Sequence, residues 1–445
     1  MVDQQEYPVS YSRRWRLWYL AFIFSNMSAG LLTPMIPLFI SLYFKQNVVY
    51  VGIASSLASL SSVIALILWG NISDNVKKRK AFILMGFAGS FVSLFFIMFT
   101  TDVMEYIGIL VVYQFFAMAS VPVSTLLVIE NEIESQWPRT VAVFSAISTL
   151  GTVLGLGVGL LIVLRDPSSI QILKLIYLIS AVIYLVAFVL AYFLLKESST
   201  KIRRSRLPNI FSIRTFERTR YAPSYVIHIV KLFGKKKGIK TSKSLILYII
   251  LCGVLMIGFQ TFFTPYPVFL IDKYNATEDI VYTMYLLNSA FSVISFNLSG
   301  NYIRKVSLQK AIYIPLAVRM FVFLGTSIIP FMSLYSFNYM ILIVLIYGAM
   351  GFVWSFIGIT QITSVTTMAD RETRGRAIGY YNSILGVGQI IGAFISGYIV
   401  IYLGYGGDFV IAAIIVAIGY IGSIKIKAGM KEQNVFQRTS VASLK

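Results

Sequence analysis

The residues best suited to contacting a bound molecule are uncharged amides and one indole ring, set within long apolar stretches of the sequence. They are Asn26, Gln114, Gln260, Asn288, Trp354, Asn382 and Gln389. Amides donate and accept hydrogen bonds without a fixed charge, and an indole adds an apolar face for stacking. The set favours reversible binding of neutral or amphipathic compounds, although each member could instead bond a neighbouring helix.

No signature of an enzyme or of a metal site is visible in the sequence. The sequence has a single cysteine, Cys252, and a single histidine, His228, and it lacks the Gly-rich Lys loop that holds ATP phosphates. We therefore expect no catalytic residue and no enzymatic activity, no bound metal, no cofactor and no direct use of ATP. A single cysteine also excludes an intrachain disulfide.

Charged groups are rare inside the apolar stretches, where they are costly and usually functional. Arg319 lies deep in one stretch; it could bind an anionic substrate, pair with a structural partner or extend to the membrane surface. All eighteen acidic residues fall in loops or at the ends of stretches. Among them Glu130 and Asp272 are the candidates for a carboxyl group that exchanges protons during a working cycle, and both could equally be structural end charges.

The elements that carry these residues must cross a membrane. Hydrophobic residues make up 57% of the 445 positions and charged residues 13%, and the mean hydropathy is +0.78. A soluble globular protein has roughly 25% charged residues, so this composition excludes that class. Apolar stretches long enough to cross about 30 Å of hydrocarbon as helices recur along the chain. Twelve are expected, at residues 17–43, 49–69, 81–100, 106–129, 140–164, 171–195, 244–271, 280–299, 311–332, 339–367, 375–403 and 408–426.

Basic residues set the orientation of these helices, because Lys and Arg are retained on the cytoplasmic side. With a cytoplasmic N-terminus, the basic residues on or near the outer side are only Lys45, Arg165, Lys174 and Lys273. We therefore predict a multi-pass protein of the cell (plasma) membrane with both termini in the cytoplasm. The glycosylation sequon at Asn275 then lies outside, whereas modification of the sequon at Asn71 would overturn the orientation.

The net charge of +20 comes mainly from one segment. Residues 196–243 hold fourteen Lys and Arg against two Glu. Beside membrane helices, such a segment is attracted to anionic lipid headgroups by about 1 kcal/mol per charge. We expect contact with anionic lipid there and no nucleic acid partner.

The chain looks like one unit duplicated. Residues 70–81 and 300–311 are identical at five of twelve aligned positions, and each segment lies between two apolar stretches. The prolines after Thr33 and Thr264 break the first helix of each half near its outer end. The predicted organisation is a six-helix bundle at 1–195, a basic cytoplasmic linker at 196–243, a second six-helix bundle at 244–430 and a cytoplasmic tail at 431–445.

The loop Gly70-Asn-Ile-Ser-Asp-Asn-Val-Lys-Lys-Arg79 resembles the signature between helices 2 and 3 of the major facilitator superfamily, Gly-x-Leu-small-Asp-Arg-x-Gly-Arg-Lys. Asn75 and Lys77 depart from that signature. The prolines of the first helix and the glycines of the fifth look most like the drug-efflux branch. The resemblance implies an all-α integral membrane protein of twelve transmembrane helices, in two pseudo-symmetric six-helix bundles that rock about a central substrate cavity.

The same resemblance implies that the loop charges form a conformational gate. Asp74 would meet Arg374 and Arg376 at the start of helix 11 when the inner side is shut. In the second half, the matching position is Arg304, and its partners would be Glu132 and Glu134. Gly70 and Arg79 are the remaining members of the predicted gate. The alternative is that the charged residues are solvated and that each of their contacts contributes under about 1 kcal/mol of stability.

Small residues at helical spacing predict close helix packing. On helix 5 these are Gly151, Gly155 and Gly159, which match three positions of an antiporter signature in the family, although Leu156 and Leu160 depart from it. On helix 11 they include Gly388 and Gly392. Packing alone explains the glycines as well as an antiport role does.

The sequence thus predicts a secondary transporter of small molecules, monomeric, with export of amphipathic or drug-like compounds favoured and protons as the candidate coupling ion. The alternative within the class is uptake or facilitated transport of a sugar, metabolite or organic anion. The alternative from another class is a transporter-like membrane scaffold or receptor that does not transport. Flux of a solute in proteoliposomes separates the first two from the third.

Overall fold

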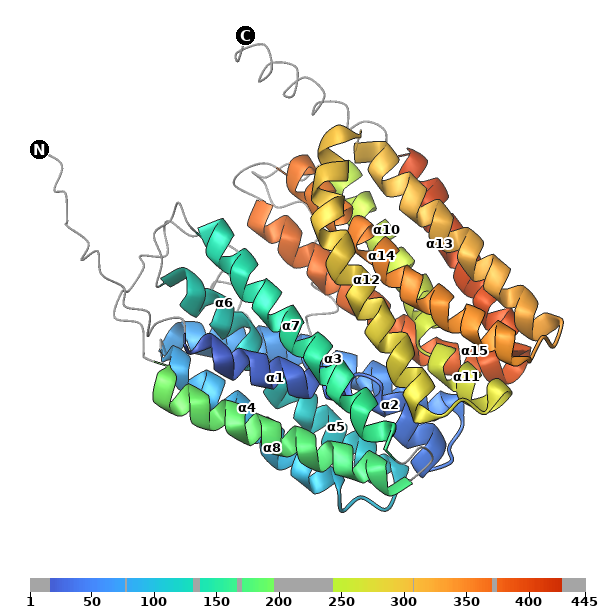
Figure 1. Ribbon diagram of the computed structural model, residues 1–445. Coiled ribbons are helices and arrows are strands. Elements are labelled where there is room, and N and C mark those ends of the chain that lie inside the picture. Colours follow the sequence, from blue (N-terminus) through green and yellow to red (C-terminus); the bar gives the residue numbers. More distant parts are fainter. Residues whose placement is uncertain are drawn as a thin grey trace, which may run out of the picture. The chain divides into compact units, whose positions relative to one another are not determined.

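The computed structural model describes residues 17–76, 78–130, 137–165, 170–195, 243–306, 308–369 and 374–425, and every regular element in these ranges is a helix (Figure 1). In the first half the elements are α1 (Tyr19–Leu32), α2 (Met35–Leu38), η2 (Phe39–Tyr43), α3 (Val48–Val76), α4 (Arg79–Ile97), α5 (Val103–Ala117), α6 (Ser120–Glu130), α7 (Trp137–Val163) and α8 (Ile170–Leu194). In the second half they are α10 (Lys243–Phe263), α11 (Tyr266–Tyr274), α12 (Glu278–Lys305), α13 (Leu308–Phe331), α14 (Phe337–Met368) and α15 (Arg374–Lys425). The basic linker lies outside the described residues, apart from its last residue.

Eleven helical segments of the described residues are long and apolar enough to span a membrane. The last of them, Ala377–Ile424, contains both of the final two expected spans. It is interrupted at Gly404, where φ is 71° and ψ is 174°, so the backbone leaves the helical region there. The eleven segments therefore account for all twelve expected crossings.

Prolines explain where the spans break. The first span breaks between α1 and α2 at Thr33 and Pro34, and the seventh breaks between α10 and α11 at Thr264 and Pro265, as their positions predict. A third break, between α5 and α6, was not expected. Pro122 explains it, since its nitrogen has no hydrogen to donate to the carbonyl of Met118.

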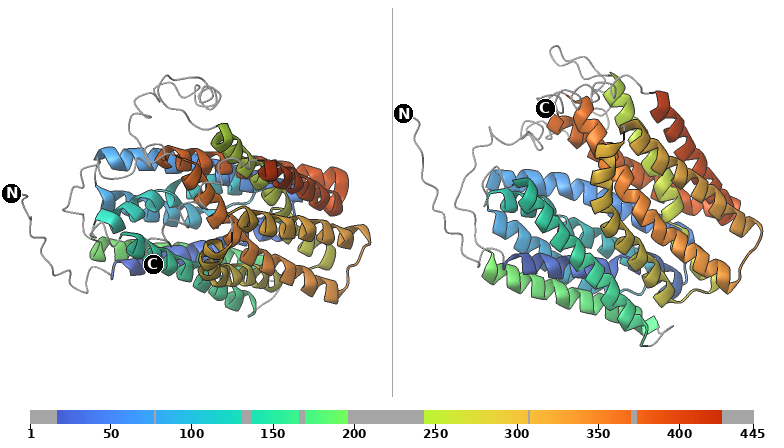
Figure 2. Two further views of the ribbon diagram at one scale, coloured as in Figure 1. Left: turned by 90° about the horizontal axis from the view of Figure 1, so that it is seen from above. Right: turned by 45° about the horizontal axis from the view of Figure 1, so that its top comes forward.

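The helices group into two compact units. Unit 1 contains residues 1–35 and 64–202, and unit 2 contains residues 36–63 and 203–445. Within each unit the long helices run alongside one another in both views of Figure 2. The first part of α3 groups with unit 2 because it packs along α15. A Cβ at Gly52 would lie 2.6 Å from the carbonyl oxygen of Ala393, and one at Gly397 would lie 2.6 Å from Cα of Val49.

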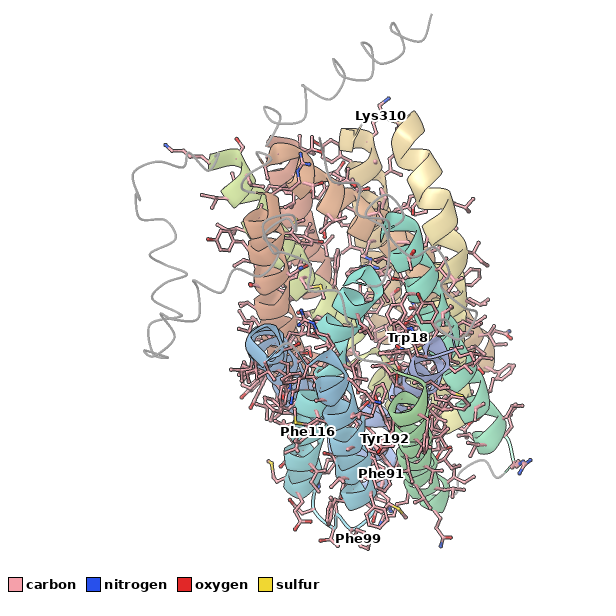
Figure 3. All side chains as sticks on the ribbon, turned by 90° about the vertical axis from the view of Figure 1, so that its left-hand side faces the viewer. Trp18, Phe91, Phe99, Phe116, Tyr192 and Lys310 are labelled. Atoms are coloured by element: carbon pink, nitrogen blue, oxygen red, sulfur yellow. The ribbon has the colours of Figure 1, made fainter. Side chains whose placement is uncertain are left out.

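In unit 1, α1 packs between α7 and α8, and α4 packs against α5, α6 and α8. An aromatic group fills the space where α1 meets α7, with Trp18, Phe22 and Phe144 within 5.8 Å of one another by ring centroids. Large apolar side chains such as Phe99 and Tyr192 project outward along the bundle (Figure 3). Exposed apolar surface of this kind is what a lipid-facing helix presents.

In unit 2, α10 packs along α15, α12 along α14, and α13 against both α14 and α15. The core between them is aromatic. Phe262 stacks on Phe323 with ring centroids 3.8 Å apart and also contacts Tyr266 and Phe409. Rings bury large apolar areas, so this cluster holds four helices together.

Candidate functional site

The glycines of α7 lie where it crosses α1. A Cβ at Gly151 would lie 2.6 Å from the carbonyl oxygen of Ile23, and one at Gly155 would overlap the backbone of Met27. Gly157, on the other side of α7, has nothing within 4 Å of its Cβ position, and Gly159 is buried. Only glycine allows α1 and α7 to approach this closely.

The second half repeats this crossing with α10 and α15. A Cβ at Gly388 would lie 2.5 Å from the carbonyl oxygen of Gly253, and one at Gly392 would lie 2.5 Å from that of Ile257. In both crossings two glycines four residues apart meet two carbonyls four residues apart. The contact equivalent to that of Gly151 is thus made by Gly388, and the contact equivalent to that of Gly155 is made by Gly392.

A seam of hydrogen bonds joins α12 to α14. Asn288 Nδ2 donates to the carbonyl of Tyr347 at 2.8 Å, and the Ser292 and Ser295 hydroxyls donate to the carbonyls of Gly351 and Phe352, both at 2.8 Å. One of the predicted binding residues, Asn288, therefore has its amide nitrogen engaged in joining two helices.

The other predicted binding residues lie in both units. In unit 1, Asn26 Nδ2 donates to the carbonyl of Phe22 on its own helix at 2.8 Å, and Gln114 is partly buried on α5. In unit 2, Gln260 packs at the Gly392 crossing and accepts a long hydrogen bond of 3.5 Å from Thr264.

The remaining three predicted binding residues are also in unit 2. Trp354 is partly buried on α14, and on α15 Gln389 is partly buried and Asn382 is exposed. Trp354 lies next to a charged group, the guanidinium of Arg319. Unit 2 thus holds five of the seven candidates, on four helices.

Of the gate residues, the structure describes three side chains. Gly70 is buried on α3, and Arg79 begins α4, where its Nη1 donates to the Ser73 hydroxyl at 2.8 Å. Arg374 begins α15 and is exposed. The Arg79 contact joins the two helices on either side of the signature loop.

The rest of the gate lies outside the described residues. This applies to the side chains of Asp74, Arg304 and Arg376, and to Glu132 and Glu134 entirely. The side chain of the coupling candidate Glu130 is also outside them. The proposed charge contacts therefore stay predictions.

Arg319 is enclosed by protein, so it does not reach the membrane surface. It is 1% exposed on α13, and its Cζ lies 4.3 Å from the ring centroid of Phe259, 5.1 Å from that of Phe263 and 5.5 Å from that of Trp354. Its Nη2 donates to the carbonyl of Met350 at 3.3 Å. Nε and Nη1 have no hydrogen-bond partner among the described residues.

Asp408 is buried, which its position at a helix end did not indicate. Helix resumes directly after Gly404, so Asp408 lies in the first turn of the last helical segment. Its side chain is 0% exposed, and neither carboxylate oxygen has a hydrogen-bond partner in the described part of the chain. Hydropathy alone could not show this, since a Gly-rich segment precedes it. The coupling candidate Asp272 is instead exposed and accepts a hydrogen bond of 2.6 Å from the Tyr405 hydroxyl.

The sequence matches a known family of helical membrane proteins over most of its length. The sequence model of the Major Facilitator Superfamily matches residues 18–369. The chain belongs to this superfamily. A search of the curated proteins finds no match.

Solved structures of superfamily members share the fold over almost the whole chain. The nucleoside transporter NupG has a TM-score of 0.67 at 14% identity and covers 94% of this chain and 100% of its own. The human organic anion transporter MFSD10 has a TM-score of 0.62 at 14% identity, with 92% and 99% covered. A bacterial homologue of the human lysosomal transporter Spinster has a TM-score of 0.69 at 10% identity, with 95% and 99% covered.

These likenesses confirm the predicted fold class. The chain is an all-α integral membrane protein with twelve transmembrane helices in two six-helix bundles. At such low identity the neighbours establish the fold and not the solute, and they do not single out the drug-efflux branch. Membership of the superfamily makes the chain a membrane transporter of small molecules.

Proposed function

We propose that this transporter exports amphipathic organic compounds from the cell by alternating access, working as a monomer in the plasma membrane with both termini in the cytoplasm. The observation that carries the proposal is the character of the candidate residues in unit 2. Gln260, Trp354 and Gln389 are partly buried, uncharged and set on three different helices beside an aromatic core. Such a surface suits a solute with both apolar and polar parts.

The glycine crossings support the mechanism. Crossings without interlocking side chains let helices slide and tilt with little steric cost. Each half has such a crossing, at Gly155 with α1 and at Gly392 with α10. Because close glycine crossings occur in both halves, they support a mechanism in which both bundles move.

Solute flux in proteoliposomes tests the function. The purified chain is reconstituted, and entry and exit of a panel of amphipathic, nucleoside, sugar and peptide solutes are followed with and without an imposed pH gradient. We expect flux of amphipathic solutes above that of protein-free vesicles, accelerated when the gradient favours proton exchange. Flux of sugars or nucleosides alone would contradict export of amphipathic compounds and favour transport of a metabolite. Absence of flux for every solute would favour a membrane scaffold or receptor that does not transport.

The gate forms a second part of the proposal. We propose that Asp74 pairs with Arg374 and Arg376, and Arg304 with Glu132 and Glu134, when the inner side is shut. Asp74→Asn should lower flux. In protein that carries Cys252→Ser and Asn382→Cys, Asp74→Asn should also raise the rate at which a membrane-impermeant reagent labels the cysteine introduced at this exposed position. Asp102→Asn is the matched control, because Asp102 caps α5 by accepting from the Met104 amide at 2.7 Å and Asn caps as well as Asp. Unchanged accessibility and flux in Asp74→Asn would end the gate hypothesis.

Orientation has a separate test. Asn275 lies in the exposed connection between α11 and α12. Expressed in a glycosylating cell, the chain should gain one glycan that Asn275→Gln removes. A glycan that instead disappears in Asn71→Gln would place the signature loop outside the cell.

A further inference from the structure

Arg319 is the most unusual group in unit 2. It is fully enclosed among α10, α13 and α14, and α14 packs against both of the others (Figure 1). A guanidinium remains protonated in proteins even when buried. The bundle therefore holds a permanent positive charge in its apolar interior.

The protein groups around that charge do not neutralise it. Its one hydrogen bond, to the carbonyl of Met350, is long at 3.3 Å, and Nε and Nη1 have no partner among the described residues. The rings of Phe259, Phe263 and Trp354 attract a cation through their faces. Ring faces leave the N–H donors unsatisfied, whereas an anionic oxygen would satisfy both charge and donors.

The rings also indicate how an anion reaches the guanidinium. Phe259 is buried, whereas Phe263 and Trp354 are partly exposed. Of the three rings around the guanidinium, Phe263 and Trp354 are therefore the ones that a ligand can contact from outside the core. A ligand that enters past them meets aromatic faces first and the positive charge behind them.

We propose that Arg319 binds the anionic group of an aromatic organic anion, and that Phe263 and Trp354 hold the apolar part of the same molecule. This inference rests on the proposed transport function and narrows its amphipathic solutes to those with a carboxylate or sulfonate. Arginine matches both groups, because its planar fork offers parallel N–H donors to paired oxygens.

The test uses naphthalene-2-sulfonate and its uncharged counterpart, naphthalene-2-sulfonamide. The sulfonate keeps its charge at all working pH values and so does not leak through the bilayer as an acid. Flux of both is measured in proteoliposomes of the full chain with Arg319→Met, Arg319→Lys and the control Lys310→Met. Lys310 is an exposed cation near the start of the same helix.

Arg319→Met should lower sulfonate flux at least about 30-fold, the loss expected when one partner of a buried charge contact is removed. Sulfonamide flux should change less than about threefold, and Lys310→Met should resemble the wild type in both. Arg319→Lys should recover part of the sulfonate flux, because it keeps the charge and loses the fork. Equal sulfonate flux in Arg319→Met and wild type overturns the inference.

Failure of the inference differs from failure of the proposed function. Wild-type protein that carries the sulfonamide and neither binds nor carries the sulfonate overturns the role of Arg319 and leaves transport of neutral amphipathic solutes intact. Wild-type protein that carries no member of the solute panel overturns the transport proposal itself.

A binding measurement covers the case in which Arg319→Met does not fold. The sulfonate should change the tryptophan emission of the wild-type protein with saturation, and the change should be lost in Trp354→Phe. A sulfonate-induced change that persists in Trp354→Phe places the anion elsewhere and overturns the inference. In the other case, an Arg319→Met protein that folds and is as heat-stable as the wild type excludes a purely structural role for the arginine.

Discussion

The two units of the protein are built alike at their helix crossings and differ in the polar groups that they bury. In unit 1 the buried pairs are neutral: the hydroxyls of Tyr106 and Tyr177 share a hydrogen bond of 2.7 Å, and those of Tyr113 and Tyr184 one of 3.3 Å. The one buried charged side chain of the described part of unit 1, Arg79, bonds to a serine at its edge.

Unit 2 buries two ionisable side chains whose hydrogen-bonding atoms are mostly without a partner among the described residues. Arg319 and Asp408 are both almost fully enclosed, and each has two side-chain atoms without a hydrogen-bond partner among the described residues. Buried groups of this kind cost several kcal/mol each unless something offsets them. The close helix crossings at glycine are common to both units. The buried ionisable groups with unpaired atoms are in unit 2, and they are candidates for binding a solute or an ion.

The largest expected change in stability comes from replacing a glycine at the helix crossings that both units share. Gly155→Ala should destabilise the protein by about 1–3 kcal/mol or more, because a methyl group would overlap the backbone of Met27. Gly392→Ala should do the same in unit 2. Thermal unfolding in detergent measures both.

Gly157→Ala is the control on α7, since its Cβ position is open. It should stabilise the helix slightly, by about 0.5–1 kcal/mol. If Gly155→Ala and Gly157→Ala unfold at the same temperature, close approach at the crossing is not what holds α1 and α7.

The next effect has the opposite sign. Asp408→Leu should leave the free energy of unfolding unchanged or raise it by about 1–2 kcal/mol, because an apolar side chain of similar volume replaces a buried carboxyl group that no described side chain satisfies. Thermal unfolding checks the stability, and flux under a pH gradient shows whether the carboxyl group also couples transport to protons. A large loss of stability would mean that Asp408 has a strong structural partner, and unit 2 would then resemble unit 1.

A smaller loss is expected from the neutral pairs of unit 1. Tyr106→Phe should lower the free energy of unfolding by about 0.5–1.5 kcal/mol, the net contribution of one buried hydrogen bond. Transport should be unaffected at temperatures where the protein is folded. A fall in flux without a fall in stability would show that unit 1 also contributes polar groups to transport.

The smallest effect concerns the seam between α12 and α14. Ser292→Ala removes one hydrogen bond of 2.8 Å to the carbonyl of Gly351 and should cost about 0.6 kcal/mol, typical of hydrogen bonds between membrane helices. A double variant with Ser295→Ala should be close to additive in thermal unfolding. Strong non-additivity would show that the seam acts as one network.

Much of the fold could be predicted because the bilayer allows few backbone arrangements. Hydropathy located the twelve crossings, and the prolines after Thr33 and Thr264 located two of the breaks. The break before Ser120 was missed, since the proline responsible lies inside an unbroken apolar stretch. Glycine spacing predicted the crossings of α7 and α15, but not which glycine meets which carbonyl.

The site was harder to predict because sequence does not show how a helix is rotated. Asn288 was predicted to contact solute, and its amide nitrogen bonds to α14. For Arg319 the sequence allows an anion site, a structural partner or extension to the membrane surface, and only the packing of three aromatic rings around it excludes the last of these. Asp408 was overlooked because acidic residues beside glycines usually mark a solvated turn, and burial by neighbouring helices leaves no local signal.

The interruption at Gly404 has a practical consequence for work on this protein. Its positive φ requires glycine, and helical backbone resumes on both sides of it. The last two crossings are therefore joined by almost no free polypeptide, which leaves no room for an inserted epitope or protease site. The connection at Asn275 to Thr277 between α11 and α12 is not helical and begins with an exposed residue, so it is the better place for an inserted tag.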